Sequence, residues 1–172
     1  LRAESDKYAV PLLLLHGLWT EPRAWRAAAS YWSHRGWNCY LPAWRGASRT
    51  LADLGARLER VAAQLGTPVV IGHDLGGPLA LALTHVAAAV AIAPLPHGPG
   101  APAHPLAGSW RARLARWRGR EFVPSGSQAA RLYGLDGGRL RPDPSDWFDQ
   151  LRALELPASS GTPRLIALPP EL

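Results

Sequence analysis

Residues 72–77 read Gly72-His73-Asp74-Leu75-Gly76-Gly77 and separate two apolar segments of different character. The run before them, residues 68–71, is short and rich in β-branched side chains, which predicts a buried strand. The run after them, residues 78–83, predicts the start of a helix. Where a strand turns directly into a helix, the two backbones approach closely, so small residues are needed on both sides of the central position. The sequence therefore predicts a strand, a very tight turn and a helix, with Asp74 at the turn.

This layout is that of a nucleophile elbow, in which a reactive residue lies between two glycine-containing positions. With aspartate at the centre, the predicted chemistry is alkyl transfer to a carboxylate rather than acyl transfer to a serine. An ordinary turn is the alternative, because Gly and Asp are common turn residues and Asp74 could simply cap the helix. The position of the motif between a strand and a helix favours the nucleophile.

The remainder of the chain alternates between apolar runs and helix-like periodicity. Strands are expected over residues 8–15, 37–44, 86–95 and 162–168, and helices over residues 23–36 and 50–66, where Thr50 and Asp53 resemble a capping pair. Alternating elements of this length predict an α/β fold with a mainly parallel sheet flanked by helices. We expect a core over residues 1–96, a lid-like insert over 97–160, and a return to a core strand over 161–172.

The insert begins with a proline-rich loop and continues with an amphipathic helix. Trp110, Leu114 and Trp117 recur at helical spacing, with arginines between them. Two interpretations fit this pattern. The helix either packs on the surface with a solvated basic face, or forms a lid whose aromatic stripe covers a pocket.

The amino-acid composition limits the classes of function that fit this chain. Hydrophobic residues make up 47% and charged residues 19% of the 172, as expected for a globular protein. The charge of +6 comes almost entirely from arginine, alongside much Ala, Gly and Pro, which indicates codon bias rather than a nucleic-acid partner. Cys39 is the only cysteine, so no internal disulfide forms, and no run is long enough for a membrane span. We therefore expect a cytoplasmic protein without nucleic-acid or membrane partners, and no residue cluster has the spacing of metal or cofactor ligands.

The apolar run 12–15 with His16 and Gly17, the segment 72–77, the strand after it and the insert together resemble the α/β-hydrolase superfamily. The aspartate turn is most similar to that of epoxide hydrolases and, less closely, haloalkane dehalogenases. Residues 16–44 are also similar to lid-containing serine members of the superfamily, so the aspartate could be a local substitution.

This resemblance implies roles for individual residues. Asp74 would attack an sp³ carbon of a small apolar epoxide or halide and form a covalent ester that water hydrolyses without a cofactor. The backbone N–H groups of Leu75 and Leu18 would form the oxyanion hole. The resemblance further assigns substrate-binding positions to Trp19, His16, His73, Trp110 and Trp117. His16 could instead hold its loop in place.

The sequence departs from the family at the base that hydrolysis requires. The family's histidine follows the last strand, whereas no histidine follows His104 here. His97, or else His104, is the candidate substitute, and Glu171 lies where the family's acid often occurs. The missing histidine and the early first strand suggest a chain shortened at both ends, with an open sheet edge available for a homodimer or a completing chain. Two alternatives remain: a non-catalytic binding module, and an esterase-like relative with serine replaced by aspartate.

Overall fold

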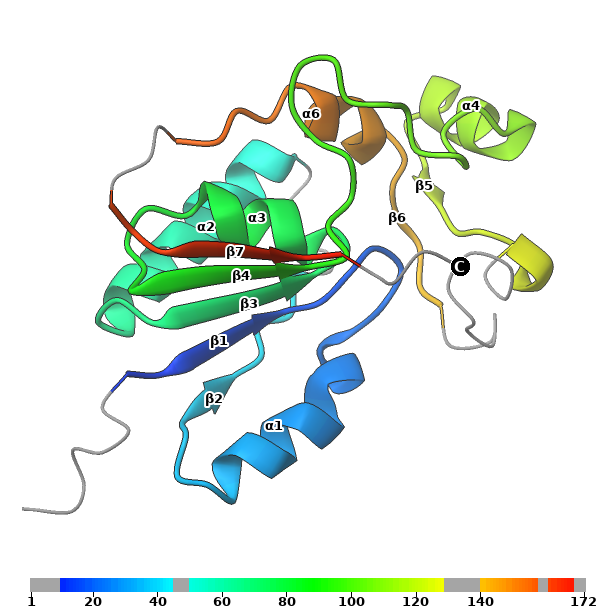
Figure 1. The fold of residues 1–172 in the computed structure, drawn as a ribbon. Coiled ribbons are helices and arrows are strands. Elements are labelled where there is room, and N and C mark those ends of the chain that lie inside the picture. The colour runs from blue at the N-terminus through cyan, green and yellow to red at the C-terminus, as the bar shows by residue number, and fades with distance from the viewer. Residues whose placement is uncertain (1–9, 45–49, 129–139, 158–160, 169–172) are drawn as a thin grey trace, which may run out of the picture.

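The computed structural model describes residues 10–44, 50–128, 140–157 and 161–168. Five strands form one parallel sheet in the order β2-β1-β3-β4-β7 (Figure 1). Their bounds are Leu12–Leu15 for β1, Cys39–Tyr40 for β2, Val69–His73 for β3, Ala88–Ile92 for β4 and Arg164–Ala167 for β7. The expected α/β fold with a parallel sheet is confirmed.

Helices cover both faces of the sheet (Figure 1). The short 3₁₀ helix η2 (Pro22–Trp25) leads into α1 (Arg26–Ser33) on one face, and α2 (Leu51–Gln64) and α3 (Gly76–Ala82) lie on the other. Side chains of β1 alternate between these layers. Leu13 and Leu15 join the buried cluster of α2 and α3, whereas Leu12 and Leu14 join that of α1. A run apolar on both faces is what a strand buried between two helical layers requires.

Several elements are shorter in the structure than the sequence predicts. The helix expected over residues 50–66 is confirmed as α2, and the Thr50 hydroxyl accepts the Asp53 N–H at 3.1 Å. The strand expected over residues 37–44 is only two residues long, because proline at position 42 provides no N–H for further pairing. The helix expected to begin at residue 23 starts with the 3₁₀ turn η2 before α1 forms.

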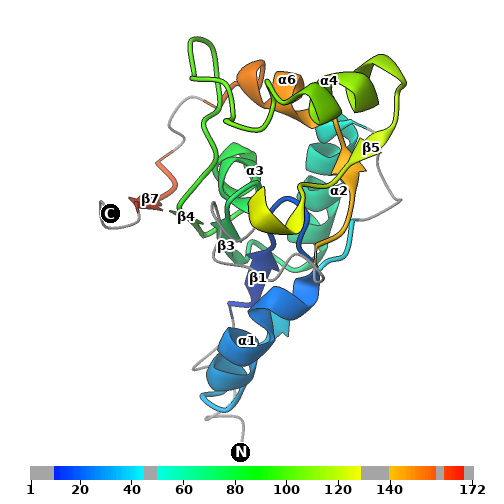
Figure 2. The same ribbon diagram turned by 90° about the vertical axis from the view of Figure 1, so that its right-hand side faces the viewer.

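The segment between β4 and β7 lies beyond one end of the sheet (Figures 1 and 2). It contains α4 (Trp110–Trp117), α6 (Trp147–Arg152) and an antiparallel pair, β5 (Glu121–Phe122) with β6 (Asp143–Pro144). Its buried side chains belong to the same cluster as Leu13 and Leu15, so it shares a core with the sheet; they include Leu106, Phe122, Trp147, Phe148 and Leu151. The division at residues 96 and 160 stays a prediction.

The expected aromatic stripe faces solvent in the structure. Trp110 and Trp117 are 73% and 80% exposed, because α4 buries only Ala112. Both indoles are therefore largely exposed, and the interpretation of the stripe as part of a lid stays a prediction. No helix within the described part of the chain is long and apolar enough to cross a membrane.

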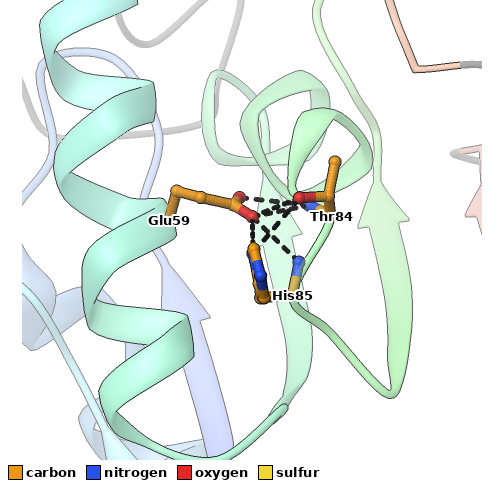
Figure 3. A network of polar contacts seen from close by, with 3 residues as sticks. All are labelled: Glu59, Thr84 and His85. Atoms are coloured by element: carbon orange, nitrogen blue, oxygen red, sulfur yellow. Dashed lines mark hydrogen bonds and ion pairs between the residues drawn. The ribbon is translucent and has the colours of Figure 1, made fainter.

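A polar cluster ties α2 to the turn between α3 and β4 (Figure 3). The Glu59 carboxylate accepts the backbone N–H groups of Thr84 and His85, the Thr84 hydroxyl and His85 Nδ1–H. Burial raises the pKa of Glu59, but these hydrogen bonds outweigh it and hold the pKa below the ordinary value. We name Glu59, Thr84 and His85 the α2 clamp.

Candidate active site

The turn between β3 and α3 has the geometry of a nucleophile elbow. Asp74 has a φ of 55°, in the left-handed region that few non-glycine residues adopt. Its backbone is fixed on both sides, because its N–H donates to the Ile92 carbonyl at 3.1 Å and its carbonyl accepts the Leu95 N–H at 3.2 Å. A Cβ at Gly72 would overlap the carbonyl oxygen of Gly76. The expected tight turn with obligatory small residues is confirmed.

The Asp74 carboxyl is buried and held by backbone donors. Asp74 is only 4% exposed, and its Oδ2 accepts the Leu18 N–H at 2.8 Å. The Leu75 N–H also hydrogen-bonds this carboxyl. The backbone N–H groups of Leu18 and Leu75, which were expected to form an oxyanion hole, thus both interact with the carboxyl of Asp74 itself.

Glycine at position 17 permits this arrangement. A Cβ built on Gly17 would lie 2.5 Å from Asp74 Oδ2, closer than atoms of this kind approach. The glycine of the His16-Gly17 pair therefore makes room for the carboxyl as it reaches the Leu18 N–H. A larger residue at position 17 would displace the Asp74 carboxyl.

Burial raises the pKa of Asp74 to about 7. The hydrogen bonds from the Leu18 and Leu75 N–H groups act against this shift and lower the pKa. The negative charge of Asp143 adds to it. Near neutral pH the carboxyl is therefore divided between its protonated and ionised forms, which is unusual for an aspartate and typical of functional sites.

Asp143 is a second buried carboxyl at this site, and no motif in the sequence predicts it. It is 3% exposed, and its Oδ2 accepts the backbone N–H of Trp19 at 2.5 Å. Consecutive N–H groups, those of Leu18 and Trp19, thus bind two different carboxyls. Asp143 reaches the site from β6, and no local pattern around residue 143 indicates this long-range contact.

Trp19 lies beside the two carboxyls, and its indole N–H already has an acceptor. It has a φ of 56° and is 1% exposed. Its indole N–H donates to the Phe122 carbonyl at 3.0 Å, and its ring makes edge contacts with Phe122, Phe148 and His104. Trp19 therefore anchors the loop after β1 to β5 and α6.

The two candidate bases differ in the nitrogen that carries the proton. Nδ1–H of His97 donates to the Leu95 carbonyl at 2.8 Å, which leaves Nε2 as the basic nitrogen. His104 instead accepts the Leu106 N–H through Nδ1 at 3.1 Å, so the proton of its neutral ring lies on Nε2. Burial lowers the pKa of His104 to about 4. In His97 the basic nitrogen is therefore not the one bonded to Leu95, whereas in His104 the basic nitrogen already accepts the Leu106 N–H; Leu95 also joins His97 to the backbone of Asp74.

The remaining predicted residues have simpler surroundings. His16 is 2% exposed, stacks on Trp44 at 3.6 Å between ring centroids, and donates from Nδ1 to the Gly17 carbonyl at 3.0 Å, which fits the interpretation that it holds its loop. His73 ends β3 and is half-buried, and burial lowers its pKa. Glu171 lies outside the described residues. Trp110 and Trp117 are at the solvent-facing side of α4.

The α2 clamp contains a hydroxyl, an imidazole and a carboxylate but does not form a catalytic triad. Thr84 and Glu59 both contact the same nitrogen of His85, Nδ1, whereas a triad needs one partner on each ring nitrogen. The clamp also precedes β4, at the opposite end of the parallel strands from Asp74. We assign it a structural role.

Comparisons with solved structures find the same fold in several hydrolases. An extracellular alpha/beta-hydrolase from a Paenibacillus species aligns with a TM-score of 0.74 at 16% identity, over 91% of this chain and 76% of that one. A methylesterase from Arabidopsis aligns with a TM-score of 0.66 at 14% identity, over 91% and 76%. A monoacylglycerol lipase from Paleococcus ferrophilus gives 0.58 at 16%, over 93% and 85%. These neighbours are not specifically epoxide hydrolases.

No curated protein matches the sequence. Residues 12–171, however, match the family described as the alpha/beta hydrolase family. Because this match extends over most of the chain, and the sheet order and the turn at Asp74 agree with it, the protein belongs to the alpha/beta hydrolase family.

Proposed function

Within this hydrolase family, we propose that Asp74 is a nucleophile that accepts an alkyl group from a small apolar epoxide or alkyl halide. The observation that carries the proposal is the 2.8 Å hydrogen bond from the Leu18 N–H to Asp74 Oδ2. The Leu18 N–H holds Oδ2, and the proposal assigns the attack on carbon to the other oxygen, Oδ1. The covalent product would be an ester whose carbonyl oxygen already lies in the oxyanion hole.

The same hydrogen bond argues against direct acyl chemistry by the unchanged chain. A serine-type mechanism needs the Leu18 and Leu75 N–H groups for the oxyanion of the substrate. Here they are bonded to the carboxyl of Asp74. Substrate oxygen and Asp74 would compete for the same donors.

Hydrolysis of the alkyl ester would require a base, and we propose His97 for this step. Its Nδ1–H is bonded to Leu95, which leaves Nε2 to accept a proton from water. If His97 performs this role, its replacement by Gln would leave the first step intact and prolong the life of the ester.

Intact-mass spectrometry of the purified chain, after incubation with a panel of epoxides and 1-haloalkanes, tests the proposal. We expect a mass gain of one ligand for an epoxide, or of one alkyl group with loss of halide for a haloalkane, or else free hydrolysed product. Both signals should disappear in Asp74→Asn. His97→Gln should convert product formation into a persistent adduct. Absence of adduct and product for every compound would contradict the proposal and favour a non-catalytic binding module.

An esterase-like ancestry is the second candidate, because structural neighbours include a methylesterase and a lipase. In that case Asp74 would replace a serine and block the oxyanion hole. Asp74→Ser should then gain hydrolysis of a p-nitrophenyl ester, whereas the unchanged chain should lack it. Ester turnover by the unchanged chain that survives Asp74→Asn would exclude Asp74 from the chemistry altogether.

A cytoplasmic location stays a prediction.

A further inference from the structure

A pocket of about 300 Å³ lies between α4 and β5, apart from Asp74. Figures 1 and 2 show these two elements side by side beyond the end of the sheet. The lining has two parts: apolar side chains of Trp110, Leu114, Ala115, Phe122 and Val123, and charged side chains of Arg111, Arg118, Arg120 and Glu121. Its volume is at the small end of the range that binds organic ligands.

The charge around the pocket is strongly positive. Arg111, Arg118 and Arg120 all reach its lining, against the single carboxylate of Glu121. None of these three guanidinium groups forms an ion pair among the residues that the structure describes. By contrast, Arg116 on the same helix binds Asp149 of α6 through Nη1 at 2.8 Å. The pocket arginines therefore keep their charge available, whereas Arg116 has a structural partner.

The apolar part of the pocket is built from both a buried and an exposed wall. Phe122 is only 4% exposed and belongs to the main core, whereas Trp110 is 73% exposed. The turn that joins α4 to β5 is fixed, because the Arg120 N–H donates to the Ala115 carbonyl and the Arg120 carbonyl accepts the Ser145 hydroxyl, both at 2.8 Å. A preformed pocket loses less entropy when it binds a ligand.

From this combination we propose that the pocket between α4 and β5 binds a small amphiphilic carboxylate, an anionic head on a short apolar tail. The guanidinium groups of Arg118 and Arg120 match the planar, two-oxygen geometry of a carboxylate. The tail lies against Trp110, Leu114 and Phe122, where it removes apolar surface from water. A neutral ligand would not use the arginines, and a simple inorganic anion would not use the apolar wall.

Isothermal titration calorimetry of the full chain with hexanoate tests this site. Hexanamide removes the charge at nearly constant size, and acetate removes the tail. We expect hexanoate to bind with an affinity that falls as salt is added, and both comparison compounds to bind at least about tenfold more weakly. Equal binding of hexanoate and hexanamide, or of hexanoate and acetate, would overturn the proposal.

Helix α4 supplies matched control variants. Arg118→Gln and Arg120→Gln should each weaken hexanoate binding by about fivefold or more, whereas Arg113→Gln, also exposed but outside the lining, should change it by less than about twofold. Trp110→Ala should weaken binding, because Trp110 is part of the lining. All four positions are solvent-exposed, so the variants should fold.

Two further outcomes bear on the identity of the occupant. Asp74→Asn should bind hexanoate as the unchanged chain does, because the pocket does not include Asp74. Loss of hexanoate binding in that variant would mean that the ligand occupies the site of the proposed nucleophile instead. Binding to anionic phospholipid vesicles that depends equally on Trp110 and Trp117, without binding of hexanoate, would show that α4 is a lipid-surface element and not a pocket for a free carboxylate.

Discussion

At the scale of single residues, Asp74 combines two costs that the fold must offset. Its backbone occupies the left-handed region, and its carboxyl is removed from water beside a second acid, Asp143. Both features are unfavourable for stability and are found where a protein maintains a reactive group. The hydrogen bonds from Leu18 and Leu75 recover part of the cost, but the pKa of about 7 shows that burial prevails.

Asp74→Asn should therefore stabilise the fold, but only at pH values at which the Asp74 carboxyl of the unchanged chain is ionised. The folded pKa of about 7 exceeds the ordinary value of 3.8, so the unchanged chain loses stability as pH rises from the lower value through the higher one. Well above pH 7 the variant should be more stable by about 4 kcal/mol, and below pH 3.8 by almost nothing. Urea denaturation across this range measures the difference, and a gain independent of pH would contradict the assignment.

The alkylation proposed for Asp74 should follow the same titration. Only the ionised carboxyl attacks carbon, so the rate of adduct formation should rise with pH through about 7. Asp143→Asn removes the neighbouring negative charge while its amide oxygen can still accept the Trp19 N–H. The midpoint of the profile should then move to lower pH. Time-resolved mass spectrometry gives both midpoints, and an upward shift in the variant would refute the electrostatic coupling.

Gly17→Ala should slow hydrolysis of the proposed alkyl ester. The added methyl group would lie 2.5 Å from Asp74 Oδ2 and force the carboxyl away from the Leu18 N–H. Loss of one backbone donor typically slows a step that develops an oxyanion, here the hydrolysis of the ester, by about 10²–10³-fold. Gly55→Ala is the matched control, because a Cβ there meets nothing within 4 Å. Rates within a factor of two of the unchanged chain would show that the carboxyl can relocate at no cost.

At the scale of secondary structure elements, the α2 clamp fastens a helix to a turn through one carboxylate. Glu59→Gln should lower the free energy of unfolding by about 1 kcal/mol, because the amide cannot accept all four donors. The pKa of Glu59 lies below its ordinary value of 4.5, so its contribution is present above pH 4.5 and is lost as pH falls below that value. Glu155→Gln, at an exposed position, provides the comparison. Equal changes in the free energy of unfolding for both substitutions would show that the α2 clamp does not stabilise the fold.

The elements that the sequence predicted well are those with local causes. Leu12–Leu15 and the turn at Asp74 could be predicted because a strand buried on both faces, and glycines where two backbones meet, leave patterns within a few residues. The pair β5–β6 could not be predicted, since each strand has two residues and their partners are distant in sequence. Asp143 was missed for the same reason. Its role depends on contact with Trp19, which only the tertiary fold brings about.

At the scale of the whole molecule, the two edges of the sheet differ. On one side β2 is only two residues long and offers little backbone for pairing. On the other side β7 presents apolar side chains to solvent: Leu165 is 61% and Ile166 51% exposed. An edge strand with exposed apolar side chains is a template for pairing with another chain. The homodimer expected from the sequence stays a prediction, and β7 is its most favourable surface.

If two copies associate through β7, the contact should be symmetric, because the same strand meets itself across a twofold axis. Ile166→Lys adds a positive charge to each side of such a contact and should shift the protein toward monomer in sedimentation velocity over a series of concentrations. Tyr40→Lys on β2, where Tyr40 is 43% exposed, introduces the same side chain at the opposite edge and should leave association unchanged. Circular dichroism establishes that both variants keep their fold. A chain that remains monomeric at every concentration, or that both substitutions affect alike, would exclude β7 as the association surface.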